Sequence, residues 1–148
     1  MIINEYNGSK ANAPKLISKI FTSILLAEEP ADRDKEHFWA IGLTASYTIK
    51  YIDLVSLGIL NEALVHPREV FRTAINNGVH GIVVVHNHPS GETMASSADK
   101  DITEKLVEAG DIIGIKVWDH IIVTLSDKYS SFQENGIIKD GIFIKEDY

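Results

Sequence analysis

The sequence predicts an α/β sandwich, in which helices pack against a β-sheet. Two observations lead to this expectation. Segments with apolar residues at helical spacing alternate along the chain with short apolar runs rich in β-branched residues, which are typical of buried strands. Proline and glycine stand between these segments, where they favour the start or end of regular structure. With 148 residues, 45% of them hydrophobic, the chain is expected to form one domain (residues 1–148) with a substantial core.

The first predicted element is a helix that opens at Pro14. Proline suits the first helical turn because the N–H that it lacks would be unpaired there in any case. Apolar residues then recur at helical spacing: Leu16, Ile17, Ile20, Phe21, Ile24 and Leu25. Residues 28–35 form a charged linker that contains Pro30. Strands are expected at residues 38–45 and 48–58, with a turn between them.

A second helix is expected to begin at Pro67 and to end at Asn76-Asn77-Gly78, a sequence typical of a helix C-terminus. The residues expected to face inward are Val70, Phe71, Ala74 and Ile75. Later in the chain, residues 114–125 predict a long strand region interrupted at Asp119-His120. The tail, residues 136–144, favours a hairpin around Lys139-Asp140-Gly141.

The main functional signal is the run His86-Asn87-His88-Pro89-Ser90-Gly91, followed by Ser96 and Asp99. Residues 81–85 predict a buried strand that ends at His86, and residues i and i+2 of an extended segment point to the same side. His86 and His88 can therefore converge on one point. A helix from Ser96, with Ile102, Leu106 and Ala109 on one face, places Asp99 in its first turn. Imidazole nitrogens and a carboxylate oxygen suit Zn²⁺, and three protein ligands leave a position for water.

Ser96 and Asp99 also fit a structural interpretation. A serine followed three residues later by an acidic residue is typical of a capping box, and an acidic side chain is favoured near a helix N-terminus. Capping alone would leave the two histidines unexplained. The two interpretations are compatible, because a residue can help to cap the helix while its neighbours bind a metal.

The pattern His-x-His, seven residues, Ser, two residues, Asp resembles that of the JAMM (MPN+) metalloproteases. The longer string His-Asn-His-Pro-Ser-Gly is similar to the RadC branch of that superfamily, as are residues 65–69, 119–123 and 129–132. The resemblance covers about residues 14–136. One departure is Ala95, where the family usually has proline, and it removes no ligand.

The resemblance implies a three-layer sandwich of a mixed, curved sheet flanked by helices, the JAB1/MPN fold, which is similar to that of cytidine deaminases. It implies that His86, His88 and Asp99 hold one zinc ion per chain and that Ser96 hydrogen-bonds the attacking water or the oxyanion. Longer RadC members carry an N-terminal helix-hairpin-helix segment, and this chain is expected to be a stand-alone form without it.

The resemblance also places the general base at Glu36, where a carboxylate at the edge of a dry core can hold a near-neutral pKa. The residues alone leave Glu28, Glu29, Glu62 and Glu69 open as alternatives. Glu69 has a structural explanation in the first turn of a helix, and Glu28 and Glu29 are expected in solvent at a helix end.

The remaining polar residues of interest are histidines and one aspartate. Asp119 and His120 are predicted either to orient a metal-bound histidine by hydrogen bonding or to form a polar break that bends the strand. The other histidines, His37, His66 and His80, are expected at surface or half-buried positions.

Composition excludes several classes of protein. The chain has no cysteine, which excludes disulfides, thiolate zinc sites and cysteine nucleophiles and fits a cytoplasmic location. The His-x-Glu and Pro-Cys-x-x-Cys motifs of nucleobase deaminases and the His-Glu-x-x-His motif of thermolysin-like proteases are both missing. No apolar run approaches the ~20 residues that cross a bilayer, and the start lacks a signal-peptide pattern. No membrane partner is expected.

The charge balance bears on nucleic-acid binding. The formal net charge is −7, and the 14 Lys and Arg residues are scattered along the chain, whereas proteins that bind phosphate backbones normally show a basic face. This argues against strong DNA binding by the chain alone, although the RadC family carries a DNA-repair label.

Together these patterns predict a zinc-dependent hydrolase that cleaves an amide or isopeptide bond in a protein or peptide substrate. Two alternatives remain open. The site could serve a metal-dependent nuclease or an accessory factor in DNA repair or recombination. The domain could also be a binding module in which the metal is structural and no turnover occurs.

Overall fold

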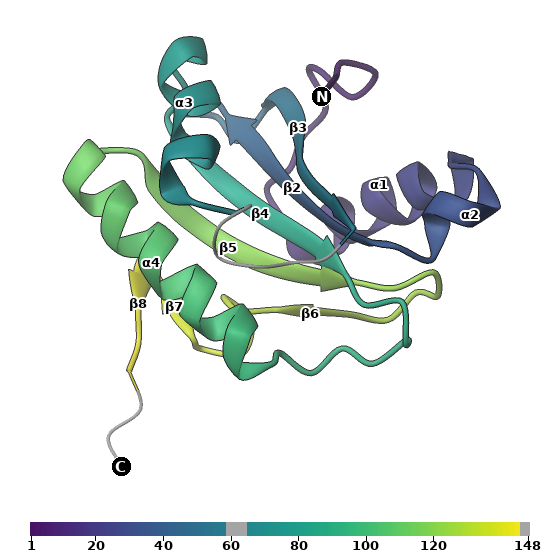
Figure 1. Cartoon of the computed structure of the whole chain (residues 1–148). Helices are drawn as coiled ribbons and strands as arrows, with labels where there is room; N and C mark the ends of the chain where they lie inside the picture. The colour runs from purple at the N-terminus through teal and green to yellow at the C-terminus, as the bar shows by residue number, and fades with distance from the viewer. Residues whose placement is uncertain (59–64, 146–148) are drawn as a thin grey trace.

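A computed structural model of the chain shows a mixed β-sheet between two layers of helix (Figure 1). It describes residues 1–58 and 65–145. The sheet has six strands in the order β1-β3-β2-β4-β5-β6, and every neighbouring pair is antiparallel except the parallel pair β4–β5. The strands are β1 (Ile2–Ile3), β2 (Glu36–Leu43), β3 (Ile49–Gly58), β4 (Gly81–Asn87), β5 (Lys116–Val123) and β6 (Tyr129–Ser131). The predicted α/β sandwich with a mixed sheet is confirmed.

Helices cover both faces of this sheet. Helix α1 (Pro14–Ala27) packs on one face, and α3 (Pro67–Asn77) and α4 (Ser97–Ile113) pack on the other (Figure 1). The segment predicted as a charged linker contains a one-turn helix, α2 (Pro30–Arg33). Arg33 explains this turn, because its guanidinium donates hydrogen bonds to the carbonyl oxygens of Leu25, Leu26 and Glu28 at the end of α1. The linker is thereby folded back onto the helix that precedes it.

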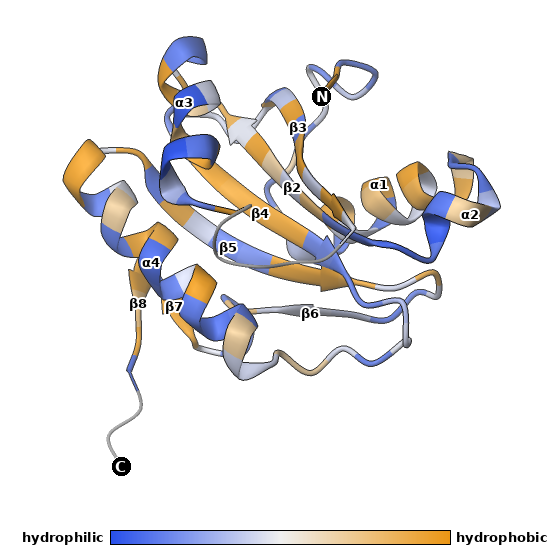
Figure 2. Ribbon diagram, viewed as in Figure 1, coloured by the Kyte–Doolittle hydropathy of each residue, from blue (hydrophilic) through white to orange (hydrophobic). Residues whose placement is uncertain are grey.

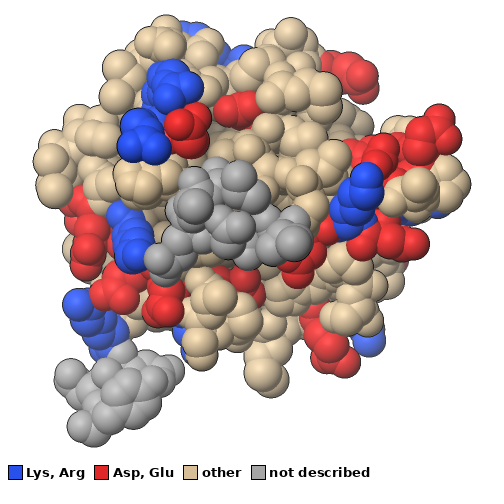
Figure 3. Space-filling view, in the orientation of Figure 1, with Lys and Arg blue, Asp and Glu red and all other residues tan. Residues whose placement is uncertain are grey.

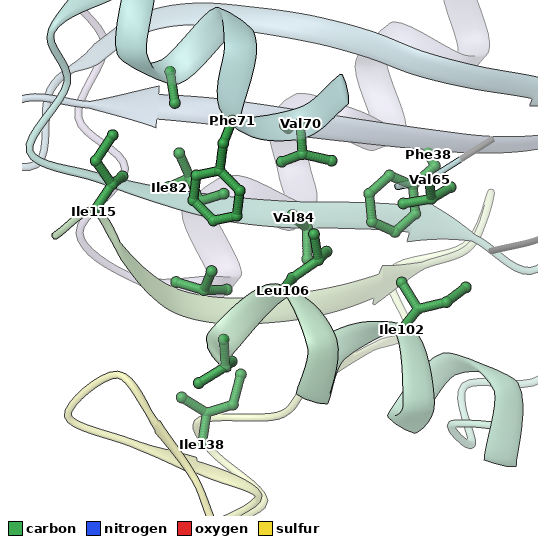
Figure 4. Close-up of a cluster of buried hydrophobic side chains, with 14 of the residues drawn as sticks. Phe38, Val65, Val70, Phe71, Ile82, Val84, Ile102, Leu106, Ile115 and Ile138 are labelled. Atoms are coloured by element: carbon green, nitrogen blue, oxygen red, sulfur yellow. The ribbon is translucent and has the colours of Figure 1, made fainter. Parts of the chain in front are cut away.

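Two hydrophobic cores lie on the two faces of the sheet. The core under α3 and α4 includes Phe38, Phe71, Val84 and Leu106 (Figure 4), and the core under α1 includes Phe21, Leu25, Trp39 and Ile121. The central strands are rich in apolar residues (Figure 2), and these residues contribute to both cores. Burying this apolar surface is the main favourable term in folding.

Strand β4 is the most enclosed element and carries the site. Every one of its residues is buried. Ile82 and Val84 point into the core under α4, whereas Val83 and Val85 point into the core under α1. Because side chains alternate along a strand, His86 emerges on the α4 side, at the end where β4 leaves the sheet.

Two details of the fold differ from the expectations. Ile75 was expected to face inward, but its side chain is 56% exposed, because the helix buries a stripe narrower than its run of apolar residues. The irregularity in β5 lies one residue before the predicted position: Ile82 pairs with Val117 and Val83 with Asp119, which leaves Trp118 as a bulge.

The tail confirms the predicted hairpin. Strands β7 (Ile138–Lys139) and β8 (Ile142–Phe143) pair antiparallel. Asp140 and Gly141 between them have φ values of 52° and 76°. Two consecutive residues with positive φ are what a tight two-residue hairpin turn requires, and Asp-Gly is a favoured sequence for it.

The surface carries charge of both signs. On the face shown in Figure 3, Lys and Arg side chains lie beside Asp and Glu side chains and form no continuous basic patch among the described residues. Across the described ranges, no helix is both long enough and apolar enough to span a bilayer.

Candidate metal centre

The end of β4 and the first turn of α4 bring three predicted ligands together. His86 Nε2 lies 3.2 Å from Asp99 Oδ1, and His88 Nε2 lies 3.1 Å from Asp99 Oδ2. Ligand atoms of all three residues lie within 4.8 Å of one another. His86 and Asp99 are buried, and His88 is half-buried at the surface of the cluster. The site is therefore closed toward the core and open on one side.

A capping box fixes the carboxylate of Asp99. The Ser96 N–H donates to Asp99 Oδ2 at 2.8 Å, and the Asp99 N–H donates to Ser96 Oγ at 3.0 Å. The capping interpretation is thus confirmed, and it does not compete with metal binding, because Asp99 still faces both histidines. Ser96 Oγ accepts this bond while its own hydroxyl hydrogen stays free to point toward the site.

A chain of hydrogen bonds sets the tautomer of His86. Thr103 Oγ1 donates to the carbonyl oxygen of Asp99 at 2.7 Å and therefore accepts from Nδ1 of His120. His120 Nε2 must then be unprotonated, and it accepts from His86 Nδ1 at 2.7 Å. This order of donors leaves the lone pair of His86 on Nε2, the nitrogen that faces Asp99.

His86 Nε2 is the atom that indicates a cation. Although it is buried beside Asp99 Oδ1, it has no hydrogen-bond partner within the described part of the chain. A lone pair aimed at a carboxylate oxygen is unfavourable unless a cation lies between them, and buried polar atoms without a partner are rare in folded proteins. Two imidazole nitrogens and a carboxylate fit a zinc-type ion.

The electrostatics of the cluster agree with this geometry. Burial would raise the pKa of the Asp99 carboxyl, but its hydrogen bonds with His88 and the Ser96 N–H hold that pKa well below its usual range. Asp99 also raises the pKa of His88, mainly through their hydrogen bond and against the effect of burial. Burial lowers the pKa of His120 well below its usual value, which keeps this ring neutral. The centre is a negative site that favours a positive charge.

Glu36 lies at the rim of this centre. It is the first residue of β2, whose pairing with β4 places Phe38 opposite His86. Alternation puts Glu36 on the same side of the strand as Phe38, the side that faces His86. Glu36 is also close enough to His88 for its charge to contribute to the raised pKa of that histidine. The structure thus brings Glu36 toward the predicted ligands.

The alternative glutamates lie elsewhere. Glu69 forms ion pairs with Arg72 and Arg68 on α3, and Glu29 is exposed. Glu28 was expected in solvent, but it is half-buried and its Oε2 lies 2.6 Å from Nε2 of His37. Glu62 lies outside the described residues.

His37 differs most from expectation. It was predicted at a surface or half-buried position, yet it is 0% exposed. Its ring stacks on Trp39 at a centroid distance of 4.9 Å, and its Nδ1 lies 2.7 Å from the carbonyl oxygen of Lys35. Both ring nitrogens therefore lie within hydrogen-bond distance of an oxygen atom, which accounts for a histidine at this buried position.

The side chains of Asp119 and His120 point to opposite faces of the sheet, as those of neighbouring residues on a strand do. His120 lies on the α4 side and contacts His86, whereas the Asp119 carboxylate accepts hydrogen bonds from the Ser131 hydroxyl at 2.6 Å and the Gln133 N–H at 2.9 Å. Asp119 therefore ties β5 to the segment after β6. Burial raises the pKa of Asp119 to about 6 even though these hydrogen bonds lower it.

Sequence reasoning did not identify Thr103. It stands four residues after Asp99, one helical turn along the same face of α4. A threonine at that spacing from an acidic ligand is a weak signal, because threonine also bonds to a carbonyl four residues earlier in ordinary helices. The role of Thr103 becomes clear only from the position of His120, whose Nδ1 lies within hydrogen-bond distance of the Thr103 hydroxyl.

Comparison with known proteins identifies the family. The family model described as the RadC-like JAB domain matches residues 17–137. The chain belongs to this family. It is 43% identical over 113 residues to a UPF0758 protein of Desulforudis audaxviator, an alignment that covers 76% of this chain and 49% of that protein. It is 48% identical over 99 residues to a UPF0758 protein of Caldanaerobacter subterraneus, covering 67% and 42%. This JAB domain spans about half the length of the curated relatives it matches.

The hydrogen-bond chain predicts a role for Thr103 in metal affinity. In Thr103→Val, His120 Nδ1 loses its acceptor, so His120 can protonate Nε2 instead and force the proton of His86 onto the nitrogen that faces Asp99. We expect zinc affinity to fall about 10- to 100-fold, measured by competition with a chelating dye. Thr73→Val is the matched control, because the Thr73 hydroxyl on α3 donates to Asp53 of β3, which is not part of this hydrogen-bond chain. Equal affinity in the two variants would contradict the tautomer assignment.

The raised pKa of Asp119 predicts a pH-dependent contribution to stability. The folded state holds its proton up to about pH 6, whereas the unfolded chain releases it near its ordinary value. Asp119 therefore stabilises the fold fully below about pH 4, and this contribution is lost as the pH rises through 6. Between pH 4 and 7 we expect the free energy of unfolding to fall by about 2–3 kcal/mol relative to Asp119→Asn. Urea titrations at both pH values measure this difference, and a constant difference would contradict the prediction.

Proposed function

We propose that this JAB domain is a zinc-dependent hydrolase that cleaves an amide or isopeptide bond in a peptide or protein substrate. The observation that carries the proposal is the buried lone pair of His86 Nε2 facing Asp99, with His88 completing the set of ligand atoms. Three protein ligands on one side of an open centre leave a coordination position for water or substrate. This arrangement is typical of catalytic rather than structural zinc sites.

His86, His88 and Asp99 would hold the ion. When bound, Zn²⁺ supplies Lewis acidity, which lowers the pKa of water and polarises a carbonyl oxygen. Neighbouring residues hold the proposed ligands in the orientation that would bind the ion. Neutral His120 and Thr103 hold the lone pair of His86 in place, and the capping box holds the carboxylate of Asp99.

Glu36 is the proposed general base. Its carboxylate would take a proton from the attacking water and pass it to the leaving nitrogen. Its place on the His86 side of β2, with an electrostatic influence on His88, supports this role. An amide needs such a shuttle because its nitrogen is a poor leaving group until it is protonated.

Ser96 is the proposed oxyanion donor. Its Oγ already accepts the Asp99 N–H, so the rotamer is fixed while the hydroxyl hydrogen remains available. A donor held in place before the reaction stabilises developing negative charge without the cost of reorganisation. Substrate would approach from the open side of the centre, where His88 and Ser96 are accessible.

Metal content tests the centre itself. We expect about one zinc per chain in protein purified without chelator, and loss of that zinc in His88→Ala, because the remaining two ligands cannot hold it. Elemental analysis measures both. His80→Ala is the matched control, since His80 is exposed and precedes β4 at the end of the strand opposite to His86. Zinc retained in His88→Ala, or absent from the wild type after incubation with zinc, would contradict the proposed ligand set.

Turnover tests the base. Glu36→Gln should keep its zinc and lose peptidase activity about 10²- to 10⁴-fold, because the amide cannot accept the proton. Glu29→Gln makes the same change at an exposed position just before α2, and this variant should retain activity. The assay uses peptide and isopeptide libraries with zinc-loaded protein. Full activity of Glu36→Gln would exclude this residue as the base, and metal-dependent cleavage of DNA that is lost in His88→Ala would favour a nuclease instead.

A further inference from the structure

The residue between the two histidines makes its own set of contacts. Backbone pairing of β2 with β4 runs from Leu43 opposite Gly81 to Phe38 opposite His86. One residue farther along β4, the side chain of Asn87 replaces the backbone as the hydrogen-bond partner of β2. Its Oδ1 accepts from the His37 N–H at 2.6 Å, and its Nδ2 donates to the carbonyl oxygen of Lys35 at 3.0 Å.

These two backbone groups flank Glu36. The carbonyl of Lys35 belongs to the peptide group before Glu36, and the N–H of His37 belongs to the peptide group after it. The Asn87 amide thus binds both peptide groups next to the proposed base, in the manner of a neighbouring strand. It holds the backbone around Glu36 on the edge of β2 where β4 offers no residue pair, while the other edge pairs with Gly58 of β3.

The His37 side chain makes a second set of contacts at the start of β2. The carbonyl oxygen of Lys35 also accepts from His37 Nδ1 at 2.7 Å, and the other nitrogen of that ring bonds Glu28 at 2.6 Å. Asn87 is 2% exposed and His37 is 0% exposed, and the bond between Asn87 Oδ1 and the His37 N–H is buried. The start of β2 is therefore crosslinked to the metal strand on one side and to the end of α1 on the other.

We propose that Asn87 is a positioning residue for Glu36, which sets the distance between the base and the metal ligands on either side of Asn87. This inference rests on the proposed function in one respect, the role of Glu36 as the base. Alternation sends His86 and His88 toward α4 and the side chain of Asn87 toward the opposite face. One tripeptide thereby supplies two ligands and also the anchor of the base.

The chemistry of the contact requires a carboxamide. One partner is a donor and the other is an acceptor, so the side chain must present an acceptor and a donor together. Aspartate would keep the bond from the His37 N–H but would place a carboxylate against the carbonyl of Lys35. Alanine would remove both bonds. A misplacement of about 1 Å at a reacting group costs roughly 10²-fold in rate, which sets the size of the expected effect.

The first test measures the position of Glu36 without reference to activity. Backbone ¹⁵N relaxation in the full chain, with and without zinc, should show Glu36 as rigid in the wild type, with an order parameter of about 0.85. In Asn87→Ala and Asn87→Asp we expect the order parameter of Glu36 to fall toward ~0.6, while those of His86 and Asp99 are unchanged. Asn77→Ala is the matched control, because the side-chain amide of Asn77 donates to the Thr73 carbonyl within α3. Wild-type order at Glu36 in both Asn87 variants would overturn the proposal.

The second test uses hydrolysis in a double-mutant cycle. Asn87→Ala should keep its zinc and its KM and lose about 10²-fold in kcat, whereas in the Glu36→Gln background the same change should have no further effect. Additive losses would overturn the assignment, because they would mean that Asn87 acts other than through Glu36. If the wild type hydrolyses no amide substrate, the proposed function fails, while the relaxation experiment still decides whether Asn87 fixes Glu36.

Discussion

The pairing of β4 with β2 on one side and with β5 on the other is the constraint on which the site depends. Strand β4 carries the two histidines, β2 brings Glu36 to them, and β5 brings His120 behind them. A shift of one residue in either ladder would turn the arriving side chain to the opposite face. The buried apolar residues of β4 hold that register, since a slip would expose them and bury polar groups in their place. Packing far from the metal ligands therefore fixes the chemistry at the end of the strand.

The ligand set follows from local rules, which explains why the sequence predicts it. His86 and His88 share a side because they are two residues apart in extended chain, at the end of β4 and just after it. Asp99 reaches them because it stands in the first helical turn after a short loop. The fold class, the helix termini at Pro67 and Gly78, and the tail hairpin follow from equally local signals. None of these predictions needs to know which strands are neighbours.

The supporting contacts depend on neighbours that the sequence does not reveal. His120 meets His86 across 34 positions, and His37 meets Asn87 across 50. The bulge at Trp118 determines which residues of β5 face α4. No residue type in this segment predicts the position of the bulge. Burial of His37 was missed for the same reason, because a histidine is favoured inside only when an acceptor such as Glu28 happens to be placed for it.

The three proposed ligands lie close together in the sequence, whereas the proposed base lies far from them. Assembly of the ligand set and arrival of the base are therefore two separate steps. His86, His88 and Asp99 fall within one strand–loop–helix unit, which closes a short loop at little entropic cost. Glu36 joins them only when β2 pairs with β4, a long-range contact whose closure costs more chain entropy than a local one. A chain with a frayed β2 would still hold its three ligands together, yet it would be without its base. Local opening at this one strand end would therefore remove the proposed base from the centre without separating the three proposed ligands.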